Sequence, residues 1–338
     1  MSGSIAVVGA TGLVGRTMLA ILAERQLPCS ELRCFASGRV PGRTVDWQGR
    51  AVPVRELGDR CFDGAEIVLF AAGNPVSETW APRAVEAGAR VVDNSSAFRY
   101  RVEIPLVVPE INGDELDSLP SLVANPNCST IAIVMALAPL TKIARLQRLW
   151  GATYQSVSGA GGRGLAELES GIRAGLEGAP PLREGKAPPF AFNVVPQIAA
   201  FEDNGYTREE MKIVWESRKI LGLPELAVSA TAVRVPVRVG HGSVVRAEFD
   251  RVVEPDEARS HWRSFPGLEV VDDPSAGRYP TPLEAEGRDA VLVGRARRAI
   301  DEPRALEFFV ASDNLRKGAA LNAVQIAEVL MAREAARR

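Results

Sequence analysis

A glycine-rich turn directly after the first buried strand constrains the fold of this chain more than any other feature. Residues 5–8 are apolar throughout and read as a buried strand, residues 9–15 spell GATGLVG, and residues 13–22 have helical character. Glycines let the backbone approach a pyrophosphate, and a helix N-terminus adds N–H donors and positive potential. The context predicts a Rossmann-like domain that binds a dinucleotide; the alternative is a tight turn needed only for packing.

The end of the second strand indicates which dinucleotide is bound. We expect this strand at residues 32–36, where a fold that binds NAD usually ends in an acidic residue. This chain has Ser37 and Arg39 there, with Arg43 soon after. A hydroxyl and a guanidinium suit a 2′-phosphate, which a carboxylate would repel. The sequence therefore favours NADP, although a single arginine is also common as a solvated loop residue.

A cysteine lies at the expected start of a buried helix. Residues 131–137 form an apolar run, and Pro126 disfavours helix at the residue before it, so we expect the helix to begin near Cys128. The N-terminal end of a helix favours a thiolate over a thiol, as an activated nucleophile requires. Cys128 is thus a candidate nucleophile, and the alternative is a buried structural cysteine.

Several candidate residues follow the expected ends of parallel strands. They are Gly9, Ser37, Gly73, Arg99 and Cys128. Ligands of parallel sheets collect at the carboxyl ends of the strands. This convergence predicts one site that combines a cofactor, an anion-binding arginine and the cysteine.

Composition limits the class of protein. The chain has 338 residues, a formal net charge of −2 and four cysteines without metal-like spacing. We expect two domains, reduced thiols, no metal, and neither nucleic acid nor a membrane as partner. The chain enters a strand by Ile5, which leaves no room for a signal peptide, and no apolar run nears the ~20 residues of a spanning helix. We expect a cytoplasmic protein.

The pattern of apolar and polar residues changes after the expected helix at Cys128. We expect strands at 149–158 and 227–239, and a charged helix at 207–221 whose first turn has a capping pattern. Residues 178–190, rich in proline, should form a loop or arm. Strands at 290–297 and 305–312 complete this α+β domain, and a terminal helix follows at 318–336.

Ten collinear motifs together resemble the aspartate-semialdehyde dehydrogenase family. They cover nearly the whole chain, and their combination is far more specific than any one of them. The motifs are GATGLVG (9–15), DNSSAFR (93–99), NPNCST (125–130), QSVSGAG (155–161), FAFNVVPQI (190–198), YTREEMKI (206–213), SATAVRVPV (229–237), VGHG (239–242), YPTPLEAEG (279–287) and DNLRKGAALNAVQIAE (313–328).

The resemblance implies an activity and an architecture. The family uses NADPH to convert L-4-aspartyl phosphate into aspartate semialdehyde and phosphate, on the route to lysine, threonine, methionine and diaminopimelate. It implies an NADP-binding domain at 1–128, completed by the helix at 318–338. A catalytic domain at 129–317 should carry a mixed or antiparallel sheet that forms the interface of a homodimer or a dimer of dimers.

The resemblance also implies roles for single residues. Cys128 matches the nucleophile that forms a thioacyl intermediate, His241 the acid/base, and Gln155 the glutamine beside the cysteine. The expected substrate residues are Glu210 and Arg234 at the amino and carboxylate ends, and Arg99, Asn127 and Lys212 at the phosphate. The expected cofactor residues are Gly9, Thr11, Gly12, Leu13, Val14, Gly73, Ser158, Gly159 and Asn314, with Ser37 and Arg39 at the 2′-phosphate.

The chemistry agrees with these roles. A thiolate attacks an acyl phosphate readily and leaves readily from a thiohemiacetal. The chain has only two histidines, and His261 lies in an expected solvated helix, which favours His241 as the acid/base. Two departures from the family pattern are residues 74–77, where a further glycine and serine are more usual, and residues 242–243.

Two other functions fit part of the pattern. N-acetyl-γ-glutamyl-phosphate reductase shares the fold and the thioester chemistry, but its cysteine loop usually reads Pro-Gly-Cys-Tyr, whereas this chain has Pro126-Asn127-Cys128-Ser129. A non-catalytic, oligomeric paralogue would be free to lose Cys128 or His241, and both are present. We therefore expect an aspartate-semialdehyde dehydrogenase.

Overall fold

The computed structural model describes residues 3–36, 42–180 and 187–337. The chain divides into two compact units. The first unit comprises Met1–Asn127 and Ala319–Arg338, and the second comprises Cys128–Gly318.

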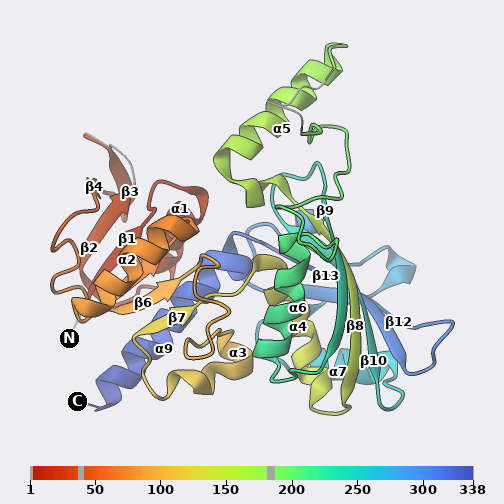
Figure 1. Cartoon of the computed structure of the whole chain (residues 1–338). Coiled ribbons are helices and arrows are strands. Elements are labelled where there is room, and N and C mark those ends of the chain that lie inside the picture. The colour runs from red at the N-terminus through yellow and green to blue at the C-terminus, as the bar shows by residue number, and fades with distance from the viewer. Residues whose placement is uncertain (1–2, 37–41, 181–186, 338) are drawn as a thin grey trace. The chain divides into compact units, whose positions relative to one another are not determined.

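The first unit is built on a seven-stranded sheet with the order β3-β4-β2-β1-β5-β6-β7. All neighbouring strands are parallel except β3 and β4, which form an antiparallel hairpin at the edge. The expected Rossmann-like architecture is confirmed (Figure 1). The strands are β1 (Gly3–Val8), β2 (Cys29–Ala36), β3 (Thr44–Trp47), β4 (Arg50–Glu56), β5 (Ile67–Phe70), β6 (Arg90–Asp93) and β7 (Leu122–Ala124).

Helices from both ends of the chain cover this sheet. Its central strands β1 and β5 are apolar and buried because helices lie on both faces of a parallel sheet. The terminal helix packs on α1 and joins the same core, in which Met18, Ile21, Val324 and Leu330 are fully buried. The helices are α1 (Leu13–Glu24), α2 (Asn74–Glu86), α3 (Pro109–Asn112), the 3₁₀ turn η1 (Gly113–Leu116) and α9 (Leu321–Arg337).

The second unit is built on a six-stranded mixed sheet with the order β11-β12-β13-β10-β8-β9. The pairs β8–β9 and β11–β12 are parallel, and the other pairs are antiparallel. The mixed sheet expected for the second half is therefore confirmed. The strands are β8 (Leu146–Gln155), β9 (Ala227–Arg234), β10 (His241–Phe249), β11 (Leu268–Val270), β12 (Val291–Arg298) and β13 (Ala305–Ser312).

Three helices cover one face of this sheet: α4 (Cys128–Thr141), α6 (Arg208–Ile220) and α7 (Pro255–Arg263). Trp262 of α7 donates its indole N–H to the carbonyl of Ala136 in α4, and its ring lies 5.2 Å from that of Phe308. Helix α5 (Gly161–Leu176) instead extends beyond the end of the sheet (Figure 1). Short turns complete the unit: η2 (Val157–Ala160), η3 (Pro274–Ala276) and α8 (Pro282–Ala285).

Element boundaries differ from the expected ones where local geometry intervenes. β9 ends at Arg234 because the chain then bends through Pro236 to Gly240, whose φ is +88°. The terminal helix is preceded by a π-helical turn, η4 (Arg316–Ala320). The hairpin of β3 and β4 was not expected. In the described parts of the chain, no helix has the length and apolar character that crossing a membrane requires.

Candidate active site

The glycine turn adopts a conformation that larger residues could not share. Gly9 has a φ of +85°, and a Cβ on it would lie 2.5 Å from the carbonyl oxygen of Ala71. A Cβ on Gly15 would lie 2.2 Å from the oxygen of Gly9, so this glycine lets α1 pack closely on the strand end. These are the requirements of a dinucleotide-binding turn.

Two helix N-termini lie at the carboxyl ends of strands in the first unit. Gly12 precedes α1 and Gly73 precedes α2, and both have extended φ and ψ without a side chain that caps the helix. Their backbone N–H groups are suited to an anionic ligand such as a pyrophosphate. Thr11, Leu13 and Val14 belong to the same turn. Ser37 and Arg39 lie outside the described residues, so their proposed contact with the 2′-phosphate stays a prediction.

The loop after β6 carries Arg99 and is fixed by a buried carboxylate. Asp93 accepts hydrogen bonds from the hydroxyls of Ser77 at 2.7 Å and Ser95 at 2.5 Å. Burial raises the pKa of Asp93, and these hydrogen bonds oppose the rise. Arg99 is buried and donates to the carbonyl of Asn94 at 2.6 Å. The loop thus holds a desolvated guanidinium, which is a suitable group for an oxyanion.

The cysteine begins α4, as expected. Cys128 is the first residue of that helix and is partly exposed, whereas Asn127 before it is buried. A Cβ on Gly318 would lie 3.0 Å from the Cβ of Cys128, so only glycine fits beside the thiol. The position at a helix N-terminus favours the thiolate, which is the nucleophilic form.

His241 is the first residue of β10 and is almost fully buried. Its Nδ1 accepts a hydrogen bond from the backbone N–H of Ser156 at 3.0 Å. A backbone N–H can only donate, so the neutral ring carries its proton on Nε2, which has no hydrogen-bond partner in the described structure. Burial, helped by the nearby charge of Arg234, lowers the pKa of His241 to about 3.

A polar network surrounds this histidine. The side-chain oxygen of Asn314 accepts hydrogen bonds from the hydroxyls of Ser156 and Ser158 and from the N–H of Gly240. Arg234 donates to the carbonyl of Ser156 at 2.7 Å. A Cβ on Gly159 would lie 3.0 Å from Nη1 of Arg234 and 3.6 Å from Nε2 of His241. The network fixes the histidine, and Arg234 and His241 leave little room for a side chain at position 159.

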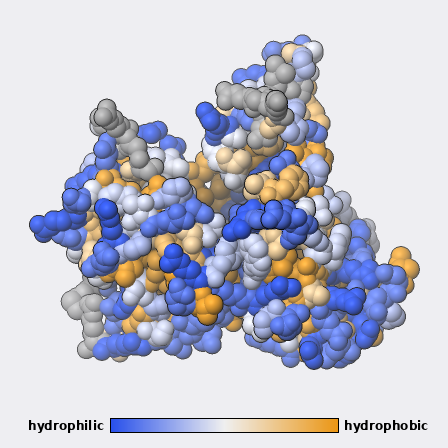
Figure 2. Space-filling model, in the orientation of Figure 1, coloured by the Kyte–Doolittle hydropathy of each residue, from blue (hydrophilic) through white to orange (hydrophobic). Residues whose placement is uncertain are grey.

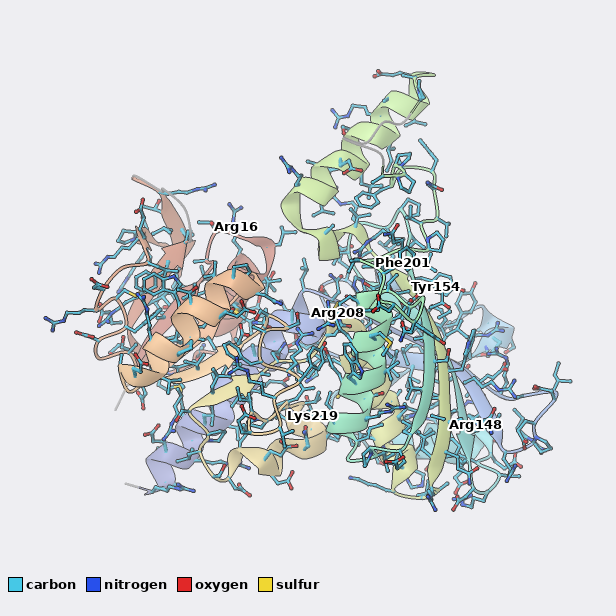
Figure 3. The ribbon with its side chains drawn as sticks, in the orientation of Figure 1. Arg16, Arg148, Tyr154, Phe201, Arg208 and Lys219 are labelled. Carbon is cyan, nitrogen blue, oxygen red and sulfur yellow. The ribbon has the colours of Figure 1, made fainter. Side chains whose placement is uncertain are left out.

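Glu209 carries the charge that partly opposes the lowering of the pKa of His241. Gln155 donates to its Oε1 at 3.3 Å, and Nζ of Lys212 lies 2.8 Å from its Oε2. The carboxylate of Glu210 instead accepts hydrogen bonds from the backbone N–H groups of Thr207 and Ala232. Figure 3 shows Arg208, which begins the helix carrying both glutamates.

Sequence reasoning missed Glu209, although a signal for it was present. Thr207 and Glu210 form a complete capping box at the start of α6. A glutamate that closes a capping box has its carboxylate bound to backbone, whereas the carboxylate of Glu209 contacts the side chains of Gln155 and Lys212.

The structure joins the expected residues in two groups, one in each unit. In the first unit, the glycine turn, Gly73 and the Arg99 loop follow the ends of β1, β5 and β6. In the second unit, direct contacts join Gln155, Ser158, Gly159, Arg234, His241 and Asn314, with Lys212 linked through Glu209.

Comparisons with known proteins cover nearly the whole chain. Residues 4–119 match the family model for the NAD binding domain of semialdehyde dehydrogenase, and residues 137–317 match that for its dimerisation domain. The aspartate-semialdehyde dehydrogenase of Aquifex aeolicus is 44% identical over 336 residues, which cover 98% of each chain. That of Bacillus subtilis is 44% identical over 334 residues and 96% of each chain.

Solved structures agree with these relatives. A Vibrio cholerae aspartate-semialdehyde dehydrogenase II complexed with ASA has a TM-score of 0.94 at 42% identity and covers 98% of each chain. A probable aspartate-semialdehyde dehydrogenase from Pseudomonas aeruginosa has a TM-score of 0.93 at 30% identity, covering 98% of this chain and 99% of its own.

Proposed function

The chain belongs to the aspartate-semialdehyde dehydrogenase family, and from this we propose that it reduces L-4-aspartyl phosphate to aspartate semialdehyde, releasing phosphate, with NADPH as reductant. The reaction is reversible and serves the synthesis of lysine, threonine, methionine and diaminopimelate in the cytoplasm. The single observation that carries the proposal is a cysteine at a helix N-terminus in the same unit as a buried histidine whose Nε2 is left available. The named relatives do not favour N-acetyl-γ-glutamyl-phosphate reductase.

The glycine turn fits a dinucleotide. The space that a Cβ on Gly9 or Gly15 would fill is taken by backbone, and the N-termini of α1 and α2 offer N–H donors at the same sheet edge. We assign NADP to this turn, to Gly73, Ser158, Gly159 and Asn314, and to Ser37 and Arg39 for the 2′-phosphate. When bound, the cofactor supplies the hydride that reduces the acyl group.

Cys128 performs the covalent step. Its thiolate Sγ attacks the acyl carbon of the substrate, the C–O bond to phosphate breaks, and phosphate leaves with the electron pair. The acyl group of the resulting thioester is the group that is reduced. When the thiohemiacetal collapses, the C–S bond breaks and the thiol of Cys128 is regenerated.

His241 donates a hydrogen bond to the substrate oxygen. Because Nδ1 is held by the N–H of Ser156, the ring offers Nε2–H as a donor to the oxygen of the tetrahedral adduct. A donor directed at developing negative charge in a buried site stabilises that charge strongly. The neutral ring keeps this proton, because losing it would leave an imidazolate. As the thiohemiacetal collapses, its hydroxyl proton passes to Sγ of Cys128, and Gln155 orients the neighbouring groups.

We assign the substrate's charged ends to opposite charges in the second unit. Arg234 is buried, and its planar guanidinium suits the α-carboxylate. Glu209 suits the ammonium, because Glu210, the residue expected from the sequence, already binds two backbone N–H groups. For phosphate we keep the residues that the resemblance implies, which are Arg99 and Asn127 of the first unit and Lys212 of the second.

The second unit carries a dimerisation domain, and we propose that its sheet packs against a second copy in a homodimer or a dimer of dimers. The face opposite α4, α6 and α7 presents Trp150, which is 45% exposed, and Tyr154, whose ring stacks on Phe309. Figure 3 shows Tyr154 and Arg148 towards opposite ends of β8. Figure 2 shows further hydrophobic surface beside α5, where Leu176 and Phe192 are exposed.

The direct test is phosphate-dependent reduction of NADP with aspartate semialdehyde. We expect turnover that requires phosphate and is faster with NADP than with NAD. N-acetylglutamate semialdehyde is the matched control substrate, because it lacks the free ammonium that Glu209 would bind. Turnover of the acetylated substrate alone would support the reductase instead, and cofactor binding without turnover of either would support a non-catalytic paralogue.

A further inference from the structure

Asn74 ties the N-terminus of helix α2 to the loop that carries Arg99. Asn74 is the first residue of α2 and follows Gly73, and Ser96 lies in the loop after β6. The Oδ1 of Asn74 accepts from the N–H of Ser96 at 3.0 Å and lies 3.2 Å from its hydroxyl oxygen. The Nδ2 of Asn74 donates to the same hydroxyl at 3.0 Å. We call these contacts the Asn74–Ser96 clasp.

The loop that carries Ser96 and Arg99 is held by hydrogen bonds at both ends. Asp93 at its start accepts from Ser77, one turn further along α2, and from the N–H and hydroxyl of Ser95. Asn94 donates its amide to the carbonyl of Phe70, at the end of β5. Arg99 at the loop's end donates to the carbonyl of Asn94. A displacement of the α2 N-terminus therefore reaches Arg99 through the contacts with Ser96 and the backbone of this loop, across which Arg99 binds the carbonyl of Asn94.

We propose that the Asn74–Ser96 clasp couples the two ligands, so that NADP bound at Gly73 raises the affinity of the Arg99 loop for phosphate. The inference rests on the proposed function, which places the cofactor at Gly73 and phosphate at Arg99. Asn74 and Ser96 are positioning residues that act through the loop. Such coupling is reciprocal, so phosphate also raises the affinity for NADP by the same factor.

The chemistry of asparagine suits this role. Its amide both accepts from the N–H and donates to the hydroxyl of Ser96, which a hydroxyl or a methyl side chain at position 74 could not do over the same distance. The clasp also explains one departure from the family pattern, since the glycine more usual after Gly73 has no side chain to reach Ser96.

The test measures binding of inorganic phosphate by calorimetry, with and without saturating NADP. In the wild type we expect NADP to lower the dissociation constant of phosphate at least about fivefold. In Asn74→Ala this factor should fall close to one, while the affinity for phosphate without NADP stays within about twofold. Coupling of wild-type size in Asn74→Ala would contradict the proposal that the clasp couples the two ligands.

Two further variants sharpen the result. Ser96→Ala keeps the backbone N–H that Asn74 accepts, so it should lose only part of the coupling, and the double variant should match Asn74→Ala. Additive losses in the double variant would overturn the clasp. Thr79→Ala is the matched control, because Thr79 lies in the same helix and its hydroxyl donates to the carbonyl of Pro75 within that helix. This variant should keep full coupling, and loss of coupling in it would contradict the proposed role of the clasp.

Arg99→Ala separates this inference from the proposed function. It should weaken phosphate binding with and without NADP. If Arg99→Ala leaves phosphate binding unchanged, the proposed phosphate site is wrong, and so is the proposed coupling through the clasp. If Arg99→Ala weakens binding and Asn74→Ala leaves the coupling intact, only the clasp is wrong.

Discussion

The backbone N–H of Ser156 donates to Nδ1 of His241 at 3.0 Å, and this contact fixes which nitrogen of the neutral ring carries the proton. Burial, helped by the charge of Arg234, disfavours the charged ring and lowers the pKa of His241 to about 3. The histidine therefore acts as a neutral donor from Nε2 near neutral pH, and protonation of the free ring is not required.

The first prediction concerns stability at low pH. The unfolded chain binds a proton on this histidine below pH ~6.5, whereas the folded protein does so only near pH 3. Between these values, stability falls as pH falls, by up to ~1.4 kcal/mol per pH unit from this group. Urea unfolding of wild type and His241→Gln should therefore differ in slope against pH between about 4 and 6. Parallel slopes would mean that His241 titrates normally in the folded protein.

The second prediction separates two neighbouring glutamates. Glu209→Gln should raise the Michaelis constant for aspartate semialdehyde tenfold or more, since a charge-assisted hydrogen bond contributes ~1.5–3 kcal/mol, and should change stability little. Glu210→Gln should instead destabilise the fold by ~1 kcal/mol, because an amide then faces a backbone N–H that the carboxylate accepted. Steady-state kinetics and urea unfolding of both variants make the test. The reverse pattern would restore Glu210 as the substrate residue.

The two glutamates illustrate which features of the fold and site can be predicted from the sequence and which cannot. The Rossmann-like unit, the helix start at Cys128 and the mixed sheet follow from local patterns: a glycine turn after an apolar strand, a proline before a capping run, and alternation. The choice between Glu209 and Glu210 has a local signal, the capping box of Thr207 and Glu210, and the N–H of Ala232 adds a second contact to Glu210. The tautomer of His241 depends on the N–H of Ser156, a contact between residues distant in sequence that no local pattern encodes.

The third prediction separates the two anion-binding arginines. Arg99→Lys should chiefly raise the Michaelis constant for phosphate, and the loss should be partial because lysine keeps the charge but not the bidentate fork. Arg234→Lys should weaken aspartate semialdehyde binding and lower turnover, because the carbonyl is then misplaced relative to Cys128. The measurement is kinetics in the direction that consumes phosphate, with each substrate varied in turn. The same pattern in both variants would mean that the sites are not separate.

The fourth prediction concerns assembly. Sedimentation at micromolar concentration should give a dimer or a larger closed oligomer. Tyr154→Lys, which places a charge on the open face of the sheet, should shift the distribution towards monomer, because an unpaired charge buried in an interface is costly. Leu283→Lys is a matched control at a residue that is 78% exposed and lies outside that sheet. A wild type that sediments only as monomer would contradict the proposed interface.

The central claim is that Cys128 forms a thioacyl intermediate, and a single-turnover measurement tests it most directly. Enzyme mixed rapidly with NADP and aspartate semialdehyde, without phosphate, should release one equivalent of NADPH per active site in a burst and then stop. Adding phosphate should restart turnover by cleaving the thioester. Cys128→Ser should bind NADP and show no burst, because a serine hydroxyl is a poor nucleophile without the thiolate's low pKa. A burst of equal size in Cys128→Ser, or none in the wild type despite phosphate-dependent turnover, would contradict the mechanism.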